Sequence, residues 1–297
     1  FKHIEKKKVR NFYSDLNDLS KSEKVYLESI AIRKRLVKEN PRRYEPDLAK
    51  GLGNLGNLYY QQKQYTKAET VILESIEIYR GLALENKQVY EPDLAFNLGN
   101  LGFFYESIKN YSKADTAYFE SLKIYENLAR KNPKRYNPDL GYTQIGIAYL
   151  MQSLLLQELD LNYQEKGLEL AQNAKVVLNA CDTSISFVQD LLKNANELEG
   201  YFLDFSAEDL EIQKAINNCL PYQERNAIEK DPSAKIINQE KVVAILEGAL
   251  NNFPQDSTLQ ALGLRAYNNL ARFALSCHQF KKAEEASLKG LEINPKE

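Results

Sequence analysis

Residues 51–56 read GLGNLG, the G-x-G-x-x-G spacing with which dinucleotide-binding proteins hold a pyrophosphate. That chemistry needs a β-strand before the glycines and a helix that opens at them. Here no strand-like run precedes the glycines, which lie inside an apolar helical pattern. A related string further along the chain has Asn97 in place of the first glycine. The spacing therefore does not predict a nucleotide site.

The residues that most often do chemistry are few and scattered. The cysteines are Cys181, Cys219 and Cys277, with neither metal-ligand nor redox spacing, so we expect reduced thiols. His3 and His278 have no partner at metal spacing, and adjacent Cys277 and His278 diverge in a helical turn. No carboxylate pair stands out as a general acid and base. We therefore predict no catalytic residue, no metal site and no cofactor, in a protein that is not an enzyme.

Composition excludes several other classes. The chain has 297 residues, 43% hydrophobic and 27% charged, with a net charge of -2. This balance suits a folded protein and offers no basic excess for nucleic acid or an anionic membrane. No apolar stretch reaches the ~18 residues of a membrane helix. We expect a cytoplasmic location; the start at Phe1 suggests a fragment or a processed form, which leaves a signal peptide undetermined.

An internal repeat of 46 residues decides the fold class. Similar segments begin at Pro46, Pro92 and Pro138. Each unit reads as two helices, because apolar residues recur at three- and four-residue steps on either side of a polar turn at 61–64. We expect the first helix to begin at Pro46, where a missing N–H costs nothing. The second helix runs towards Asn86, and a Tyr-Glu-Pro-Asp link opens the next unit.

Small residues in register indicate close helix packing. Gly56 and Gly102 lie inside the first helices, where a glycine costs ~1 kcal/mol relative to alanine. We expect these glycines to let the second helix approach at Ala68 and Ala114. Stacked helix pairs of this kind bury one continuous core.

These residues carry a family resemblance. Asn54-Leu55-Gly56, followed by Tyr59, Tyr65, Ala68, Ile72 and Ser75, resembles the tetratricopeptide repeat. The longer unit is similar to the repeats of kinesin light chains and their bacterial relatives. The resemblance implies an all-α fold, a right-handed α-solenoid of stacked antiparallel helix pairs. Its typical role is protein binding.

The resemblance varies along the chain. We expect a repeat array over residues 1–175, with a degenerate first unit and an insertion from Met151 to Asn162. Residues 176–240 are expected to be an irregular helical segment continuous with the solenoid, and residues 241–297 repeat-like helices. The sequence stops just after Pro295 without a polar capping helix. This end predicts that the natural chain continues, or that a partner or a second copy covers it.

The resemblance also implies a binding groove on the first helix of each pair, where extended peptides or helices bind. An asparagine there often bonds a ligand backbone, since an amide both donates and accepts. Asn54, Asn100 and Asn269 hold that place, although neighbouring helices or water could satisfy them instead. Transferred by register, the groove set is Lys50, Asn54, Asn57, Gln61, Phe96, Asn100, Phe103, Ser107, Tyr142, Tyr149, Arg265, Asn269, Arg272 and Ser276.

Aromatic and amide residues dominate the first three units of this set, and Lys50 is their lone cation. We therefore expect a partner peptide or helix with apolar anchors rather than a charged terminus. The leading hypothesis is an interaction module, acting as a scaffold or as the docking or sensor part of a larger protein. One alternative is a peptide-responsive domain that controls an attached effector, with residues 176–235 as its hinge. Another is a non-catalytic part of an enzyme.

Overall fold

The computed structural model describes residues 2–293, with side chains from residue 21 onwards. The side chain of His3, and Pro295, lie outside the described residues. Within them every regular element is an α-helix, as predicted. The helices are α1 (Lys2–Glu39), α2 (Pro41–Gln61), α3 (Tyr65–Glu85), α4 (Lys87–Ser107), α5 (Tyr111–Lys131), α6 (Pro133–Glu158), α7 (Asn162–Asn179), α8 (Ser186–Asp204), α9 (Ala207–Ile228), α10 (Pro232–Asn252), α11 (Ser257–Ser276) and α12 (Phe280–Ile293).

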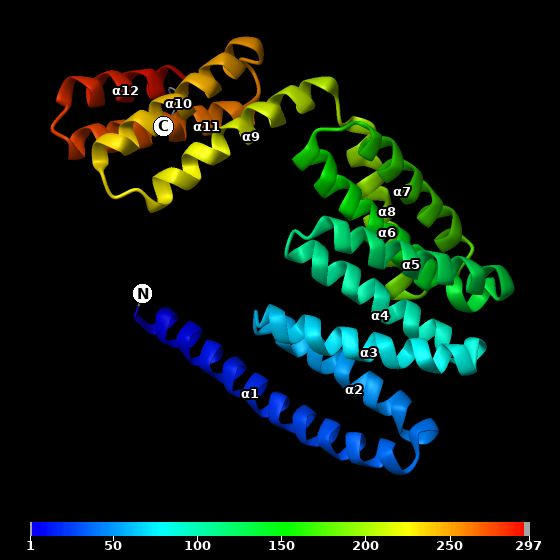
Figure 1. The fold of residues 1–297 in the computed structure, drawn as a ribbon. Helices are drawn as coiled ribbons and strands as arrows, with labels where there is room; N and C mark the ends of the chain where they lie inside the picture. Colours follow the sequence, from blue (N-terminus) through cyan, green and yellow to red (C-terminus); the bar gives the residue numbers. More distant parts are fainter. Residues whose placement is uncertain (1, 294–297) are drawn as a thin grey trace. The chain divides into compact units, whose positions relative to one another are not determined.

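The chain divides into two compact units. Unit 1 comprises residues 1–152 and 165–202, and unit 2 comprises residues 153–164 and 203–297. In unit 1, α1 contacts α2, and the same holds for each consecutive pair up to α4 and α5. In unit 2, the consecutive pairs from α9 to α12 are in contact in the same way (Figure 1). This sequential packing of helical hairpins is that of an all-α solenoid. The domain boundaries expected after residues 175 and 240 stay predictions.

The first helix of each pair begins five residues before the repeated proline, so the predicted start at Pro46 is wrong. Helix α2 begins at Pro41, with Pro46 inside it, and the expected Tyr-Glu-Pro-Asp link is helical. The true starts are set by asparagines: the Oδ1 atoms of Asn40, Asn86 and Asn132 each accept a hydrogen bond at 3.3 Å from a backbone N–H three residues on. Each cap thus provides an acceptor for a backbone N–H of the first turn, which has no partner within the helix.

The turn after α2 matches the prediction. Helix α2 ends at Gln61 and α3 begins at Tyr65. Lys63 and, one repeat later, Lys109 take left-handed backbone angles, with φ of 59° and 60°. The insertion expected from Met151 mostly lengthens a helix, because α6 has 26 residues where α2 and α4 have 21.

The repeated glycines leave room for side chains of the second helix. A Cβ added at Gly56 would lie 2.4 Å from Ile72 Cγ1, and one at Gly102 would lie 2.6 Å from the Tyr118 ring. Ile72 and Tyr118 are themselves one repeat apart. The close approach was predicted, but the nearest side chains are these two rather than Ala68 and Ala114.

Two buried serines tie the second helices to the first. Ser75 Oγ donates to the carbonyl of Ala49 at 2.7 Å, and Ser121 Oγ donates to the carbonyl of Ala95 at 2.8 Å. Both serines have an exposed fraction of 0%. A buried hydroxyl needs such a partner, so these bonds fix how α3 lies on α2 and α5 on α4.

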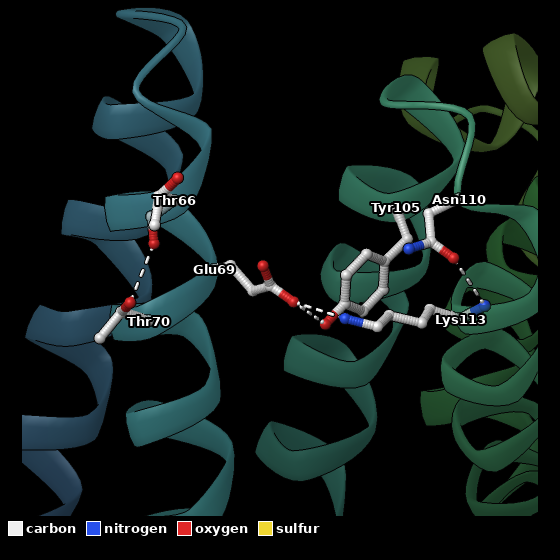
Figure 2. Close-up of polar contacts among 6 residues, drawn as sticks. All are labelled: Thr66, Glu69, Thr70, Tyr105, Asn110 and Lys113. Atoms are coloured by element: carbon white, nitrogen blue, oxygen red, sulfur yellow. Dashed lines mark hydrogen bonds and ion pairs between the residues drawn. The ribbon is translucent and has the colours of Figure 1, made fainter.

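A carboxylate on α3 links three successive helices of unit 1. Glu69 Oε1 accepts hydrogen bonds from the Tyr105 hydroxyl on α4 at 2.7 Å and from Lys113 Nζ on α5 at 2.9 Å (Figure 2). Lys113 Nζ also lies 4.9 Å from the centre of the Tyr105 ring. The hydrogen bonds from Lys113 and Tyr105 lower the pKa of Glu69 despite its partial burial.

Unit 2 contains the same arrangement on its last three helices. Glu247 on α10 accepts hydrogen bonds from the Tyr267 hydroxyl on α11 and from Lys289 Nζ on α12, the latter at 3.1 Å. The hydrogen bond from Tyr267 is the main cause that lowers the pKa of Glu247. One polar clamp therefore recurs in both units, although it was not predicted.

Glu69→Gln should reduce the free energy of unfolding by about 1 kcal/mol at neutral pH, because a charge-assisted hydrogen bond becomes a neutral one at a partly exposed site. The folded-state pKa of Glu69 lies below its ordinary value of 4.5. The carboxylate thus contributes fully above pH 4.5, and its contribution disappears as pH falls through the folded-state pKa. Urea unfolding of both proteins at several pH values measures this difference. The exposed Glu126→Gln is the control; a gap that persists at low pH contradicts the assignment.

Candidate functional site

Four of the predicted groove residues of unit 1 are aromatic, and they form two columns: one pair along α4 and one pair along α6. Phe96 and Phe103 are two helical turns apart on α4, and Tyr142 and Tyr149 hold the same positions on α6. Their exposed fractions are 53%, 51%, 44% and 37%. The buried faces of these helices carry leucines such as Leu98. The pattern that buries the leucines therefore turns the aromatic rings outward.

On α2 the same positions are polar. Lys50 and Asn57 stand where α4 has Phe96 and Phe103, and Asn54 lies between them. All three are exposed. Lys50 and Asn54 border a hollow of about 300 Å³ between α1 and α2, which Tyr26 and Arg33 also line. On α2, therefore, the positions that match the exposed aromatic residues of α4 and α6 are polar, and two of these polar residues border the hollow.

Two predicted residues are engaged locally. Ser107 Oγ donates to the carbonyl of Phe104, and Ser276 Oγ to the carbonyl of Phe273, both at 2.7 Å. A serine bonded to its own helix in this way has its donor occupied. The half-buried Asn100 and the exposed Gln61 complete the part of the set in unit 1.

Two aromatic residues of this face escaped the sequence prediction. Tyr60 meets Phe103 edge-on, with ring centres 5.8 Å apart, and Phe187 on α8 lies 6.4 Å from Tyr142. Tyr60 lies just before the turn that ends α2, and Phe187 lies outside the repeat. For Tyr60, the only signal in the sequence is its position next to the predicted groove residue Gln61. For Phe187 there is no such signal, because it lies outside the repeat.

The electrostatics of this face change along it. Burial raises the pKa of Tyr149, and the nearby carboxylates Glu197 and Glu106 raise it further. Glu106 accepts a hydrogen bond from the Tyr118 hydroxyl at 3.0 Å, yet burial raises its pKa above the ordinary value. Two carboxylates therefore lie near Tyr149 on α6, whereas the hollow at α2 is lined by Lys50 and Arg33 together with Asp47.

The remaining predicted residues lie in unit 2, on α11. Arg265, Asn269 and Arg272 line one cavity of about 420 Å³, which α9 and α10 also border. Arg272 Nη2 donates to Asn269 Oδ1 at 3.1 Å. The structure therefore brings these three residues together. The amide side chains that α9 and α10 add to this cavity were missed.

Other kinds of site have little support. Over the described residues, no group of three or more His, Cys, Asp and Glu side chains is placed to hold a metal ion. Nor is any described helix both long and apolar enough to cross a membrane. Gly51 to Gly56 lie within α2, as expected from the absence of a preceding strand. His278 occupies the left-handed turn position that ends α11, with φ of 56°.

Two family models match the chain. A tetratricopeptide repeat model matches residues 48–83, on α2 and α3, and a second tetratricopeptide repeat model matches residues 264–297. No curated protein matches the sequence.

Two solved structures are distantly similar to the chain. The chain is similar to BtubC (BKLC) from P. vanneervenii, with 16% identity and a TM-score of 0.45, over 93% of this chain and 91% of that one. It is also similar to Nro1, a hypoxic regulator of sterol synthesis and nuclear import adaptor. That match has 11% identity and a TM-score of 0.37, over 92% of this chain and 86% of Nro1. Neither likeness is close enough to transfer a function.

Proposed function

Since this chain belongs to the tetratricopeptide repeat superfamily, whose typical role is protein binding, we propose that it holds an extended peptide or a helix of a partner protein on the α2–α4–α6 face of unit 1. It acts as a scaffold, or as the docking part of a larger protein, without catalysing a reaction. The partner contributes apolar anchor residues. Amides such as Asn54 and Asn100 bond its main chain.

One observation carries this proposal: Phe96, Phe103, Tyr142 and Tyr149 expose large aromatic surfaces at matching repeat positions of α4 and α6. Exposed aromatic residues that repeat in this way are typical of binding surfaces, because rigid rings provide much contact area at low entropic cost. The side-chain amides of Asn54 and Asn100 can form hydrogen bonds with the partner's main chain, which do not depend on the partner's side chains. Together they suit a chain with apolar side chains and an accessible backbone.

The test uses peptides selected from a displayed random library against the full chain. Phe96→Ala combined with Tyr142→Ala should weaken the selected peptides by about 30-fold or more, as expected for two anchor positions. Fluorescence anisotropy of labelled peptides measures the affinities. Circular dichroism should stay unchanged, because both side chains are half exposed.

A matched control comes from the second helices. Leu73 on α3 and Phe119 on α5 are also one repeat apart, with exposed fractions of 40% and 44%. Leu73→Ala combined with Phe119→Ala removes similar exposed apolar area and should leave the affinity unchanged. If this control loses affinity and the aromatic pair does not, the binding face is the other one and the proposal is wrong.

A further inference from the structure

One edge of unit 1 carries an excess of positive charge. The turns that join α1 to α2, α3 to α4 and α5 to α6 lie on the same side of unit 1, because consecutive helices run in opposite directions (Figure 1). We call residues 38–45, 84–91 and 130–137, which form these turns, the turn edge. They contain eight cations and four carboxylates, a net charge of +4 in a chain whose net charge is -2. The charge of the whole chain therefore gives no sign of this edge.

The three turns differ in chemistry at equivalent repeat positions. On the α3–α4 turn, Leu84 and Val89 occupy positions that hold cations in the turns on both sides. Leu84 is 83% exposed and Val89 is 52% exposed. The matching cations are all exposed: Lys38 and Arg43 on the α1–α2 turn, Arg130 and Arg135 on the α5–α6 turn. Two apolar side chains therefore project from the turn edge between two cationic turns.

The α5–α6 turn is the most cationic of the three. Four exposed cations lie within six residues, and none of them forms an ion pair with a described carboxylate. They are Arg130, Lys131, Lys134 and Arg135. The nearest turn beyond it contains Asp182, whose Oδ1 accepts a hydrogen bond from Ser184 Oγ at 2.7 Å. On the first turn, by contrast, Arg42 Nε lies 3.5 Å from Glu85 Oε2.

Helix stability does not account for these cations. Arg42 and Arg43 lie in the first turn of α2, and Lys134 and Arg135 lie in the first turn of α6. The N-terminal end of a helix carries a partial positive charge, so it favours carboxylates and disfavours cations. Yet α2, α4 and α6 have no acidic residue in the first turn. Residues that break a local rule of this kind are expected at functional sites.

We propose that the turn edge docks on the surface of a membrane that contains anionic lipids. The cations contact the anionic lipid headgroups, while Leu84 and Val89 enter the interface between them. This interaction goes beyond the proposed function, because it does not use the α2–α4–α6 face. Together with the proposed function, it places the bound partner at that surface.

The residue types favour a membrane over a protein or a nucleic acid. The anchors of protein interfaces are mostly tryptophan, tyrosine and arginine in enclosed pockets, and leucine and valine are under-represented among them. Leu84, at 83% exposure, projects from the edge instead of lying in a pocket. A nucleic acid gains from the cations but not from the two apolar side chains. A bilayer interface binds cations and apolar side chains together.

Co-sedimentation of the full chain with vesicles tests this proposal. Vesicles of phosphatidylcholine with about one third phosphatidylserine should bind the chain at least about tenfold more tightly than vesicles of phosphatidylcholine alone. Added salt should weaken this binding. Lys134→Glu combined with Arg135→Glu should reduce the affinity more than about tenfold, since each cation near an anionic surface contributes about fivefold. Leu84→Ser combined with Val89→Ser should reduce it about fivefold at unchanged charge.

The charge reversal includes a check on folding. Carboxylates in the first turn of α6 favour the helix, so the Lys134→Glu/Arg135→Glu variant should unfold at the same urea concentration or at a higher one. A matched control lies on the opposite edge, where Lys63 and Lys109 are exposed turn residues. The 21 residues of α2, about 30 Å of helix, separate the two edges. Lys63→Glu combined with Lys109→Glu makes the same change in net charge and should leave vesicle binding unchanged.

Three outcomes contradict the proposal. The first is equal binding to anionic and neutral vesicles, and the second is an equal loss in the two charge-reversal variants. The third is an unchanged affinity of the Leu84→Ser/Val89→Ser variant, or tighter binding of a single-stranded oligonucleotide or a polyglutamate peptide than of the anionic vesicles. Either result would mean that the edge attracts polyanions in general. The Phe96→Ala/Tyr142→Ala variant should keep its affinity for vesicles, so failure of the proposed peptide groove is seen separately.

Discussion

Phe202→Ala should lower the free energy of unfolding of unit 1 by about 3–5 kcal/mol, the usual cost of removing a buried phenylalanine ring. Phe202 is completely buried near the end of α8. Its ring lies against Gly167 on α7, where an added Cβ would come within 2.1 Å of Cζ. The ring thus occupies space that α7 leaves free at Gly167.

Gly167→Ala makes the same contact testable from the other side. With Phe202 in place, the new methyl group overlaps the ring and should destabilise unit 1 by about 1–3 kcal/mol. In the Phe202→Ala background the space is empty, so the alanine should instead stabilise by up to about 1 kcal/mol through its helix propensity.

This reversal of sign is the critical outcome of the double-mutant cycle. Urea unfolding gives the four free energies, and hydrogen exchange of the α7 and α8 amides shows where the loss falls. Equal effects of Gly167→Ala in the two backgrounds would mean that the ring and the glycine do not share this space.

The sequence predicted the helices of unit 1 because their signals are periodic and local. The 46-residue step and the three- and four-residue spacing of leucines predict α2 to α5 and a turn at 61–64, which the structure has at 62–64. The predicted helix starts are wrong, because Pro46, Pro92 and Pro138 lie inside the helices rather than at their first position. Asn40, Asn86 and Asn132 repeat with the same 46-residue step and mark the true starts, so the sequence does carry a signal for them.

The candidate site was predictable only where it follows the repeat. Phe96 and Tyr142 were expected on the exposed face because the register places them there, and both are half exposed. Arg265 and Arg272 were expected for the same reason. Asn226 on α9 belongs to a stretch without repeat pattern, so only the fold brings its amide to α11. The hydrogen bonds of Glu69 could not be predicted from the sequence either, because Glu69 and Lys113 lie 44 residues apart.

Gly102→Ala should reduce the free energy of unfolding by about 2–3 kcal/mol, the upper range for overpacking a helix contact. A Cβ at this position would lie 2.6 Å from two atoms of the Tyr118 ring. The hydrogen bond from the Tyr118 hydroxyl to Glu106 limits how far the ring can move away. The strain therefore falls on the α4–α5 backbone contact.

Gly81→Ala is the matched control and should have the opposite sign. Gly81 is an exposed residue of α3, and a Cβ added there meets nothing within 4 Å. The same substitution should stabilise the chain by about 0.5–1 kcal/mol, since alanine loses less backbone entropy in a helix. Urea unfolding of both variants measures the two changes. Helix propensity contributes equally at both sites. The difference between the two changes in unfolding free energy therefore reports the close approach of Tyr118 alone. Two changes of equal sign and size would show that Gly102 is not needed for packing.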